Sequence, residues 1–211
     1  MSAEKVIAVA RGELGNTEFP PGSNLQKYGE AYGLNGVPWC LQFLWWCCRE
    51  AGESAAFFAG AKTASCGTFL RWYTEQGQTV PVSAAQPGDV VILNFSGTTD
   101  TQHCGLIWNV RKHYLQTYEG NTSPGAEGSQ DNGGCVADKV RYPSQIVGVC
   151  KMTYTKKKPK IDWEGHWAEE HIRYCIEHGY MQGYDDGTFR PNGPITRAEL
   201  ATIIHRMKEA I

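Results

Sequence analysis

The 211-residue sequence predicts an α+β domain followed by a small all-α module. Helical patterns come first and a run of short strands follows them, which is the order typical of α+β folds. The lysine-rich segment 154–160 then lacks apolar periodicity, and its charges and proline suit an exposed linker. We therefore expect a first domain over residues 1–153 and a second module over residues 161–211.

Three amphipathic patterns predict the helices of the first domain. Residues 1–15 place charges among apolar side chains, as a short amphipathic helix does. Residues 41–48 repeat apolar side chains at i, i+3, i+4 and i+7, and Gly52 can end that helix. Residues 66–73 repeat the same spacing, and Gly77 is the expected stop.

Strands follow these helices. Pro87 and Gly88 are the residues that a type II turn favours, and an apolar run follows them directly. The predicted strands are residues 90–95, 103–110, 114–119, 136–142 and 146–154. We expect them to form an antiparallel sheet.

The tail carries two further helical patterns. The first runs from about His166 to His178 and is stopped by Gly179. Residues 185–187 form a turn, and Thr196 with Glu199 forms a capping box for the second helix. The apolar stripe of this second helix consists of Leu200, Ile203, Ile204 and Met207. Two helices alone bury little surface, so we expect the module to need a packing partner.

Bulk composition narrows the class of protein. A formal net charge of −2 argues against a nucleic-acid binder, which usually carries a basic surplus. No run approaches the ~18 apolar residues of a membrane span. Charges interrupt the first residues, so they do not form a signal peptide, and we expect synthesis in the cytoplasm with another exit route for any work outside the cell. The eight cysteines are then expected to be free thiols, and none has the C-x-x-C spacing of a zinc site.

Three separated stretches carry the groups that a cysteine nucleophile needs. Cys40 lies in the first turn of its predicted helix, where unpaired N–H groups and the helix dipole stabilise the nucleophilic thiolate. His103 opens a strand and can serve as general base. Glu119 or Asn121, at the end of the next strand, can hold the imidazole in one tautomer. The alternative is that Cys40 is a small buried residue like the other cysteines.

The register of the predicted hairpin decides whether these groups meet, because side chains alternate between the two faces of a sheet. A two-residue turn at residues 111–112 would place His103 opposite Gly120. Glu119 and Asn121 would then lie on the other face. A three-residue turn or one bulge restores the pairing, so we predict an odd-length turn or a bulge in this hairpin.

The first part of the chain contains several short sequence blocks in a definite order. They are Gly22-Ser23-Asn24 with Tyr28, Pro38-Trp39-Cys40 with Phe43, Pro87-Gly88-Asp89, His103-Cys104-Gly105-Leu106-Ile107, Glu119-Gly120-Asn121-Thr122, and Asn132-Gly133-Gly134 with Val136, Lys139 and Arg141. In this order they resemble the blocks of CHAP domains, the cysteine, histidine-dependent amidohydrolases and peptidases. The resemblance implies a papain-like or NlpC/P60-like fold.

The resemblance also implies roles for individual residues. Cys40 matches the nucleophile of the family and His103 its general base. Glu119 and Asn121 match the polar residues that orient the histidine and support the site. The backbone N–H of Cys40 would then contribute to an oxyanion hole.

The chain differs from the family pattern at two places. Cys104, beside the general base, stands where an aliphatic residue is usual, and we expect it to pack. Some phage relatives bind calcium near the front of the domain, but residues 16–24 contain only Glu18 as an acid. No metal and no cofactor are therefore predicted.

The tail has a dense set of blocks of its own. They are Asp162, Gly165-His166-Trp167-Ala168, Ile172, Gly179, Gly183-Tyr184, Asp186-Gly187-Thr188-Phe189-Arg190-Pro191 and Ile195-Thr196-Arg197-Ala198-Glu199. They resemble one S-layer homology (SLH) repeat, which implies binding of a secondary cell-wall polymer. Arg197, Trp167 and Asp186 are the expected contacts, with Arg197 facing an anion because guanidinium suits carboxylates. The alternative is that Arg197 only pairs within the module. Such repeats usually occur in threes, so we expect that three chains trimerise.

Together these expectations describe a phage-type peptidoglycan hydrolase, an endolysin, with peptidoglycan and wall polymer as its partners and holin-dependent release. The bond attacked is either the N-acetylmuramoyl-L-alanine amide or an amide of the peptide stem or bridge. A host autolysin is one alternative. A wall-anchored binding protein with an inactive head is another.

Overall fold

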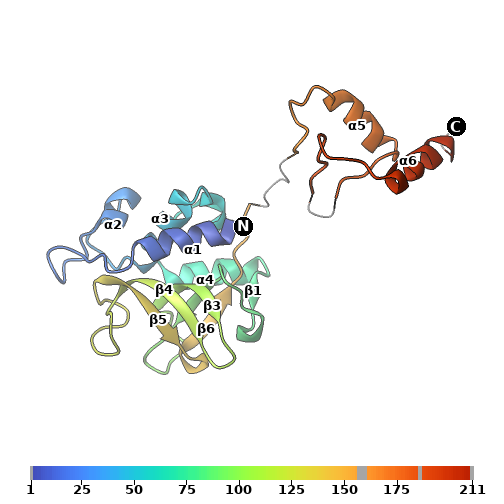
Figure 1. Ribbon diagram of the computed structural model, residues 1–211. Coiled ribbons are helices and arrows are strands. Elements are labelled where there is room, and N and C mark those ends of the chain that lie inside the picture. The colour runs from blue at the N-terminus through green and yellow to red at the C-terminus, as the bar shows by residue number, and fades with distance from the viewer. Residues whose placement is uncertain (1, 156–160, 185–186, 210–211) are drawn as a thin grey trace. The chain divides into compact units, whose positions relative to one another are not determined.

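The structure is a computed structural model that describes residues 2–155, 161–184 and 187–209. The chain divides into two compact units, Met1–Lys156 and Lys157–Ile211 (Figure 1). Most of the predicted linker lies outside the described residues.

The first unit begins with the helices. They are α1 (Ser2–Gly12), α2 (Lys27–Tyr32), α3 (Cys40–Glu50) and α4 (Cys66–Glu75), with short 3-10 helices η1 (Ser54–Ala56), η2 (Phe58–Gly60), η3 (Val82–Ala84) and η4 (Pro143–Gln145). The helices predicted from residues 1–15, 41–48 and 66–73 are confirmed as α1, α3 and α4. The short helix α2 was not predicted. The Gln26 side chain caps it by accepting backbone hydrogen bonds, and six residues are too few to show a helical period.

The strands form one antiparallel sheet, as expected. They are β1 (Thr79–Val80), β2 (Val90–Leu93), β3 (His103–Val110), β4 (Leu115–Thr122), β5 (Cys135–Arg141) and β6 (Ile146–Cys150). Their order across the sheet is β1-β6-β2-β3-β4-β5. The bounds of β3 agree with the prediction, whereas β2 and β6 end earlier than predicted and β4 runs on through Thr122. The two-residue strand β1, which pairs with β6, was not predicted.

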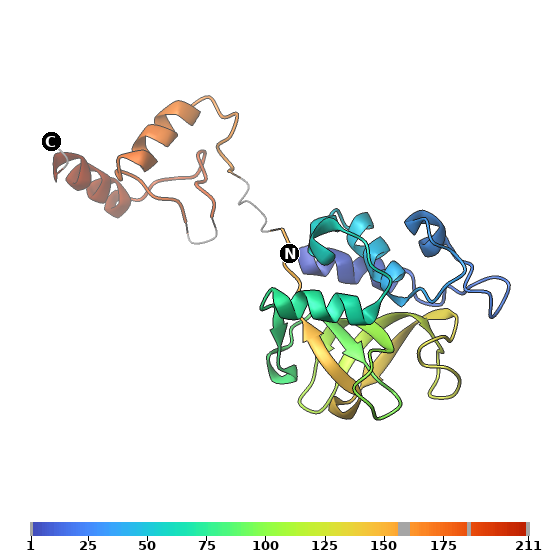
Figure 2. The ribbon, with the colours of Figure 1, turned by 180° about the vertical axis from the view of Figure 1, so that it is seen from behind.

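Helices α1, α3 and α4 lie on one face of this sheet (Figure 1 and Figure 2). Val90 and Ile92 of β2 join the core on the helix side, and Val91 and Leu93 join a smaller apolar cluster on the opposite face. Both faces of β2 are therefore apolar, which explains the unbroken apolar run in the sequence. Residues on one strand consequently divide between the two faces by alternation.

The hairpin between β3 and β4 contains the predicted bulge. Ile107 pairs with Thr117 and Asn109 with Gln116, so Trp108 is the extra residue. Beyond the bulge, Leu106 lies opposite Tyr118. This register places Gly105 beside the Glu119 side chain, because a Cβ on Gly105 would lie 2.8 Å from the Glu119 Cγ. The prediction of an odd-length turn or a bulge is confirmed, in the form of a bulge.

The second unit contains helices α5 (Glu169–Glu177) and α6 (Arg197–Glu209). Helix α5 begins later than expected, since turns occupy the residues before it. The capping box of α6 is confirmed: the Glu199 N–H donates to Thr196 Oγ1 at 3.2 Å, and the Thr196 N–H donates to Glu199 Oε2 at 2.8 Å. Part of the predicted turn at 185–187 lies outside the described residues. The described part of this unit, 161–184 and 187–209, contains no strand.

The apolar stripe of α6 remains largely uncovered. Leu200 is 47% exposed, Ile204 58% and Met207 47%. No helix in the described part of the chain, α6 included, combines the length and the apolar character that a membrane crossing requires.

Candidate active site

Cys40 is the first residue of α3, and the loop in front of it is held by a buried carboxylate. The Trp39 indole N–H donates to Glu18 Oε2 at 3.3 Å, and the Asn24 N–H donates to the same oxygen at 3.1 Å. The Gly22 N–H donates to the other oxygen of Glu18. Glu18 thus fixes the segment that leads into α3, and the Cys40 sulfur comes to lie at the amino end of the helix dipole.

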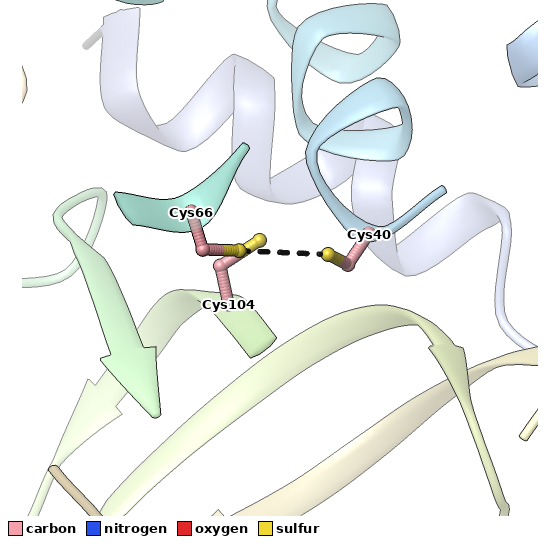
Figure 3. A group of neighbouring side chains, drawn as sticks. All are labelled: Cys40, Cys66 and Cys104. Atoms are coloured by element: carbon pink, nitrogen blue, oxygen red, sulfur yellow. Dashed lines mark hydrogen bonds between the residues drawn. The ribbon is translucent and has the colours of Figure 1, made fainter. Parts of the chain in front are cut away.

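Two other thiols surround the Cys40 sulfur. Cys66, the first residue of α4, has its Sγ 3.8 Å from the Cys40 Sγ (Figure 3). Cys104, from β3, completes the group. Hydrogen bonds from Cys104 and then Cys66 lower the pKa of Cys40 well below its usual value, against the effect of burial, and His103 adds to the lowering. Burial and the hydrogen bond to Cys40 raise the pKa of Cys104 well above its usual value. Of these three thiols, Cys40 is therefore the one whose pKa is lowered, and Cys104 and Cys66 keep their S–H protons as donors to it.

His103, the first residue of β3, and Glu119 of β4 form a fully buried pair. The His103 Nε2 lies 3.1 Å from Glu119 Oε2. Burial alone would lower the pKa of His103, but its interactions with Cys40 and then Glu119 raise that pKa to about 9. The imidazole is therefore protonated at neutral pH.

Glu119 is kept ionised by two further donors. The Arg141 guanidinium donates through Nε to Oε1 at 2.8 Å and through Nη2 to Oε2, and Thr117 Oγ1 donates to Oε1 at 2.6 Å. Burial raises the pKa of Glu119, but the hydrogen bonds from Arg141 and then His103 outweigh it and lower that pKa to about 2. A fork of this kind fixes the plane of the carboxylate as well as its charge.

The nucleophile and the base lie close enough to shift each other's pKa. They make no hydrogen bond of ordinary length: His103 Nδ1 is buried and has no such partner among the described residues. Because Glu119 takes Nε2, Nδ1 is the nitrogen left for the Cys40 sulfur. Catalytic hydrogen bonds are often long before substrate binds and tighten in the complex.

Asn121 is buried but does not bond to the histidine. Its Nδ2 donates to Asn132 Oδ1 at 3.0 Å, and its Oδ1 accepts from the Gly134 N–H at 3.3 Å. Its φ of +63° lies in the left-handed region, where asparagine is more tolerated than most residues. Asn121 thus ties the segment before β5 to the end of β4.

Sequence reasoning did not single out Arg141, Thr117 or Cys66 as site residues. A basic residue ending an otherwise half-apolar strand was the available signal for Arg141. Thr117 lies two residues before Glu119 on the same face of β4, so strand alternation was the signal there. Nothing local marks Cys66, which is 26 positions from Cys40 in the chain.

The predicted wall-polymer residues lie in the second unit. Trp167 is 85% exposed and Arg197, at the start of α6, is also exposed. Asp186 lies outside the described residues. A cavity of about 550 Å³ in this unit is lined instead by Arg190 and Arg206, among others. Sequence reasoning did not single out these two arginines.

Family models match two parts of the chain. The CHAP domain model matches residues 32–121, which include Cys40, His103 and Glu119. The S-layer homology domain model matches residues 162–201.

Curated relatives match over short stretches. The chain is 48% identical over 48 residues to the "Cellulosome-anchoring protein" of Acetivibrio thermocellus, covering 23% of this chain and 11% of that protein. It is 40% identical over 47 residues to "Outer membrane protein SlpA" of Thermus thermophilus, covering 22% and 5%. It is 42% identical over 43 residues to the "S-layer protein" of Bacillus licheniformis, covering 20% and 5%. The chain thus spans a small fraction of the length of these relatives. No solved structure matches it significantly.

The stretch that the CHAP domain model matches contains both Cys40 and His103, the residues that the structure brings close together. The chain is thus similar to a CHAP domain over residues 32–121 and to an S-layer homology domain over residues 162–201.

Proposed function

We propose that this chain is a peptidoglycan hydrolase that cleaves an amide bond by cysteine nucleophilic catalysis, and that its S-layer homology domain holds it on the cell wall. The observation that carries the proposal is the placement of Cys40 at the start of α3, where its pKa is lowered, together with His103 held by Glu119 at 3.1 Å. The family of the first domain supports the choice of substrate.

The proposed reaction uses the described residues in two steps. The Cys40 thiolate attacks the amide carbonyl carbon, the carbon–nitrogen bond breaks, and the His103 imidazolium gives its proton to the leaving amine. Water then attacks the thioester while His103 takes a proton, and the acid leaves with the thiolate restored. The Cys40 N–H, at the free end of α3, is a donor for the developing oxyanion. Cys40 is only 4% exposed, so little of its surface is open to a substrate.

The test of catalysis is a zymogram on purified walls with the full chain and its Cys40→Ala variant. We expect a cleared zone with the full chain and none with the variant. Equal clearing by both would show that Cys40 is not the nucleophile. A chain that binds walls and clears none would be a binding protein with an inactive head.

Two bonds fit this chemistry: the N-acetylmuramoyl-L-alanine amide and an amide within the peptide stem or bridge. Mass spectrometry of the digested wall separates them. Amidase activity releases intact stem peptides from glycan, whereas endopeptidase activity leaves part of the stem on the muramic acid.

We also propose that the second unit contacts a wall polymer through Arg197, Trp167 and Asp186. Exposure of Arg197 and Trp167 supports this assignment. Sedimentation with purified walls tests it: Arg197→Gln should reduce the bound fraction, and Lys208→Gln, an exposed charge in the last turn of α6, is the matched control. If Arg206→Gln reduces binding and Arg197→Gln does not, the ligand lies in the cavity instead.

The uncovered stripe of α6 supports trimerisation through the second unit. An apolar stripe of this kind on a small module calls for a partner. Light scattering on the full chain should give three times the mass of one chain. The Ile204→Asp variant should give the mass of a single chain. A monomer at all concentrations would contradict this. A phage origin and release through a holin belong to the same proposal, and clearing of walls from outside and inside cells tests them.

A further inference from the structure

Cys40, Cys66 and Cys104 bring three sulfur atoms together at the junction of α3, α4 and β3 (Figure 3). All three sulfurs lie within 4.8 Å of one another, and all three residues are buried. Within the part of the chain that the structure describes, this is the one cluster with the composition of a metal site.

The spacing suits a thiophilic ion. Zinc–thiolate bonds are about 2.3 Å long, so three sulfurs around one zinc ion lie about 3.8–4.0 Å apart. The Cys40 and Cys66 sulfurs are already 3.8 Å apart. The Cys40–Cys66 pair is therefore already at the spacing of a zinc site, and Cys104, whose sulfur lies within 4.8 Å of both, needs to move by about 1 Å at most.

The electrostatic surroundings also suit a thiolate complex. Three thiolates around one divalent cation carry a net charge of −1. Cys40 and Cys66 are each the first residue of a helix of at least ten residues, so two helix amino ends face this charge. His103 Nδ1 is buried without a hydrogen-bond partner among the described residues, but it is not part of this group of sulfurs.

We propose that Cys40, Cys66 and Cys104 form a three-thiolate site for a soft divalent cation of the zinc class. Metal–sulfur bonds form to all three residues, the S–H protons of Cys66 and Cys104 pass to solvent, and no oxidation state changes. The consequence for activity rests on the proposed function: the lone pair that Cys40 needs for attack is held by the ion, so the loaded enzyme is inactive and a chelator restores it.

Binding is tested with zinc alone on the reduced, chelator-treated full chain, in competition with a chromophoric chelator. We expect one zinc ion per chain. Cys66→Ser and Cys104→Ser should each weaken binding by more than the about 100-fold that loss of an outer-shell partner costs. Cys135→Ser and Cys175→Ser, which remove thiols outside the cluster, should leave binding unchanged. Loss of binding in Cys175→Ser instead would place the ion in the second unit and overturn the proposal.

A second readout needs no variant, which matters because Cys66 and Cys104 are buried and their replacement could impair folding. Zinc should slow alkylation of Cys40, Cys66 and Cys104, mapped by peptide mass spectrometry, and should not change the rate at Cys175. Equal rates with and without zinc at the three cluster thiols would overturn the site.

Activity on walls separates this proposal from the proposed function. Zinc at one equivalent should abolish clearing, and chelator should restore it. If zinc binds the three thiols but the zinc-free chain clears no walls, the site stands and the hydrolase proposal fails. If the chain clears walls equally with and without bound zinc, the inhibitory role fails and the hydrolase proposal stands.

Discussion

The Glu119 carboxylate links the two other charged side chains of the candidate site, His103 and Arg141. It accepts from Arg141, Thr117 and His103, and all of these groups are buried or nearly so. A buried ion pair contributes little by its presence, but removing one partner leaves a buried charge without compensation. The cost of disturbing Glu119 should therefore appear in stability as well as in catalysis.

Glu119→Gln should lower the free energy of unfolding by about 3–5 kcal/mol, because it leaves the Arg141 guanidinium buried without its counter-charge. Denaturant unfolding followed by circular dichroism measures this. Glu127→Gln, which changes an exposed acid in the loop before β5, is the matched control. An unfolding free energy equal to that of the unchanged chain would show that Arg141 finds another partner.

Activity should fall as pH rises through about 9, where His103 loses the proton that it gives to the leaving amine. Glu119→Gln removes one of the interactions that raise the pKa of His103, so this alkaline limb should move to lower pH. Rates on soluble wall fragments between pH 5 and pH 10 test the shift. An alkaline limb at the same pH in both proteins would contradict the assignment of His103.

The stability of the fold should depend on pH through the same two groups, Glu119 losing its contribution at low pH and His103 losing its contribution at high pH. The pKa of Glu119 falls from 4.5 to about 2 on folding, so its contribution is present above pH 4.5 and is lost as pH falls towards 2. The pKa of His103 rises from 6.5 to about 9, so its contribution is present below pH 6.5 and is lost as pH rises towards 9. The joint contribution is therefore greatest between pH 4.5 and 6.5. Melting temperatures measured from pH 2 to pH 9 check this, and they should be highest between pH 4.5 and 6.5.

At the scale of elements, the site depends on how closely β3 approaches β4. Gly105 lies between His103 and Ile107 on one face of β3, and the Glu119 side chain passes over it to reach the imidazole. A Cβ there would lie 2.8 Å from Glu119 Cγ and 3.0 Å from Thr117 Cβ. The absence of a side chain at this position is what admits the carboxylate.

Gly105→Ala should displace the Glu119 carboxylate and lower kcat by about 100-fold or more, the contribution typical of positioned acid–base groups. Binding of walls through the second unit should be unaffected. Gly12→Ala, at the end of α1 with nothing within 4 Å of the added carbon, is the control. Full activity of Gly105→Ala would mean that the strands separate without loss of the His103–Glu119 contact.

At the scale of the whole molecule, the two compact units differ in how much apolar surface they bury. The first has a core on both faces of its sheet, whereas the second leaves the stripe of α6 exposed. Small units with little buried surface are marginal unless they associate. Their stabilities should therefore respond differently to protein concentration.

Calorimetry of the full chain should give two transitions. The transition of the second unit should rise in temperature with protein concentration, because association stabilises only the folded form. Glu119→Gln should lower the other transition alone. A single transition that is independent of concentration would contradict both the trimer and the independence of the units.

Much of this architecture follows from local patterns. The helices α3 and α4, the strand β3 and the capping box of α6 were predictable because spacing of apolar residues and cap residues act within one turn or one strand. The need for a bulge or an odd-length turn between β3 and β4 was predictable for another reason: without one, His103 and Glu119 would lie on opposite faces of the sheet. The six-residue helix α2 and the two-residue strand β1 are too short to carry a period.

Local sequence patterns were enough to predict that helices precede the sheet, that Cys40 lies at the start of a helix, and that the hairpin between β3 and β4 needs a bulge or an odd-length turn. Which side chains surround the Cys40 sulfur depends instead on how the elements pack together. Cys66 and Cys104 meet Cys40 because α3, α4 and β3 pack together, and Arg141 reaches Glu119 because β5 pairs beside β4. Contacts between residues far apart in the chain depend on packing, and no local period encodes them.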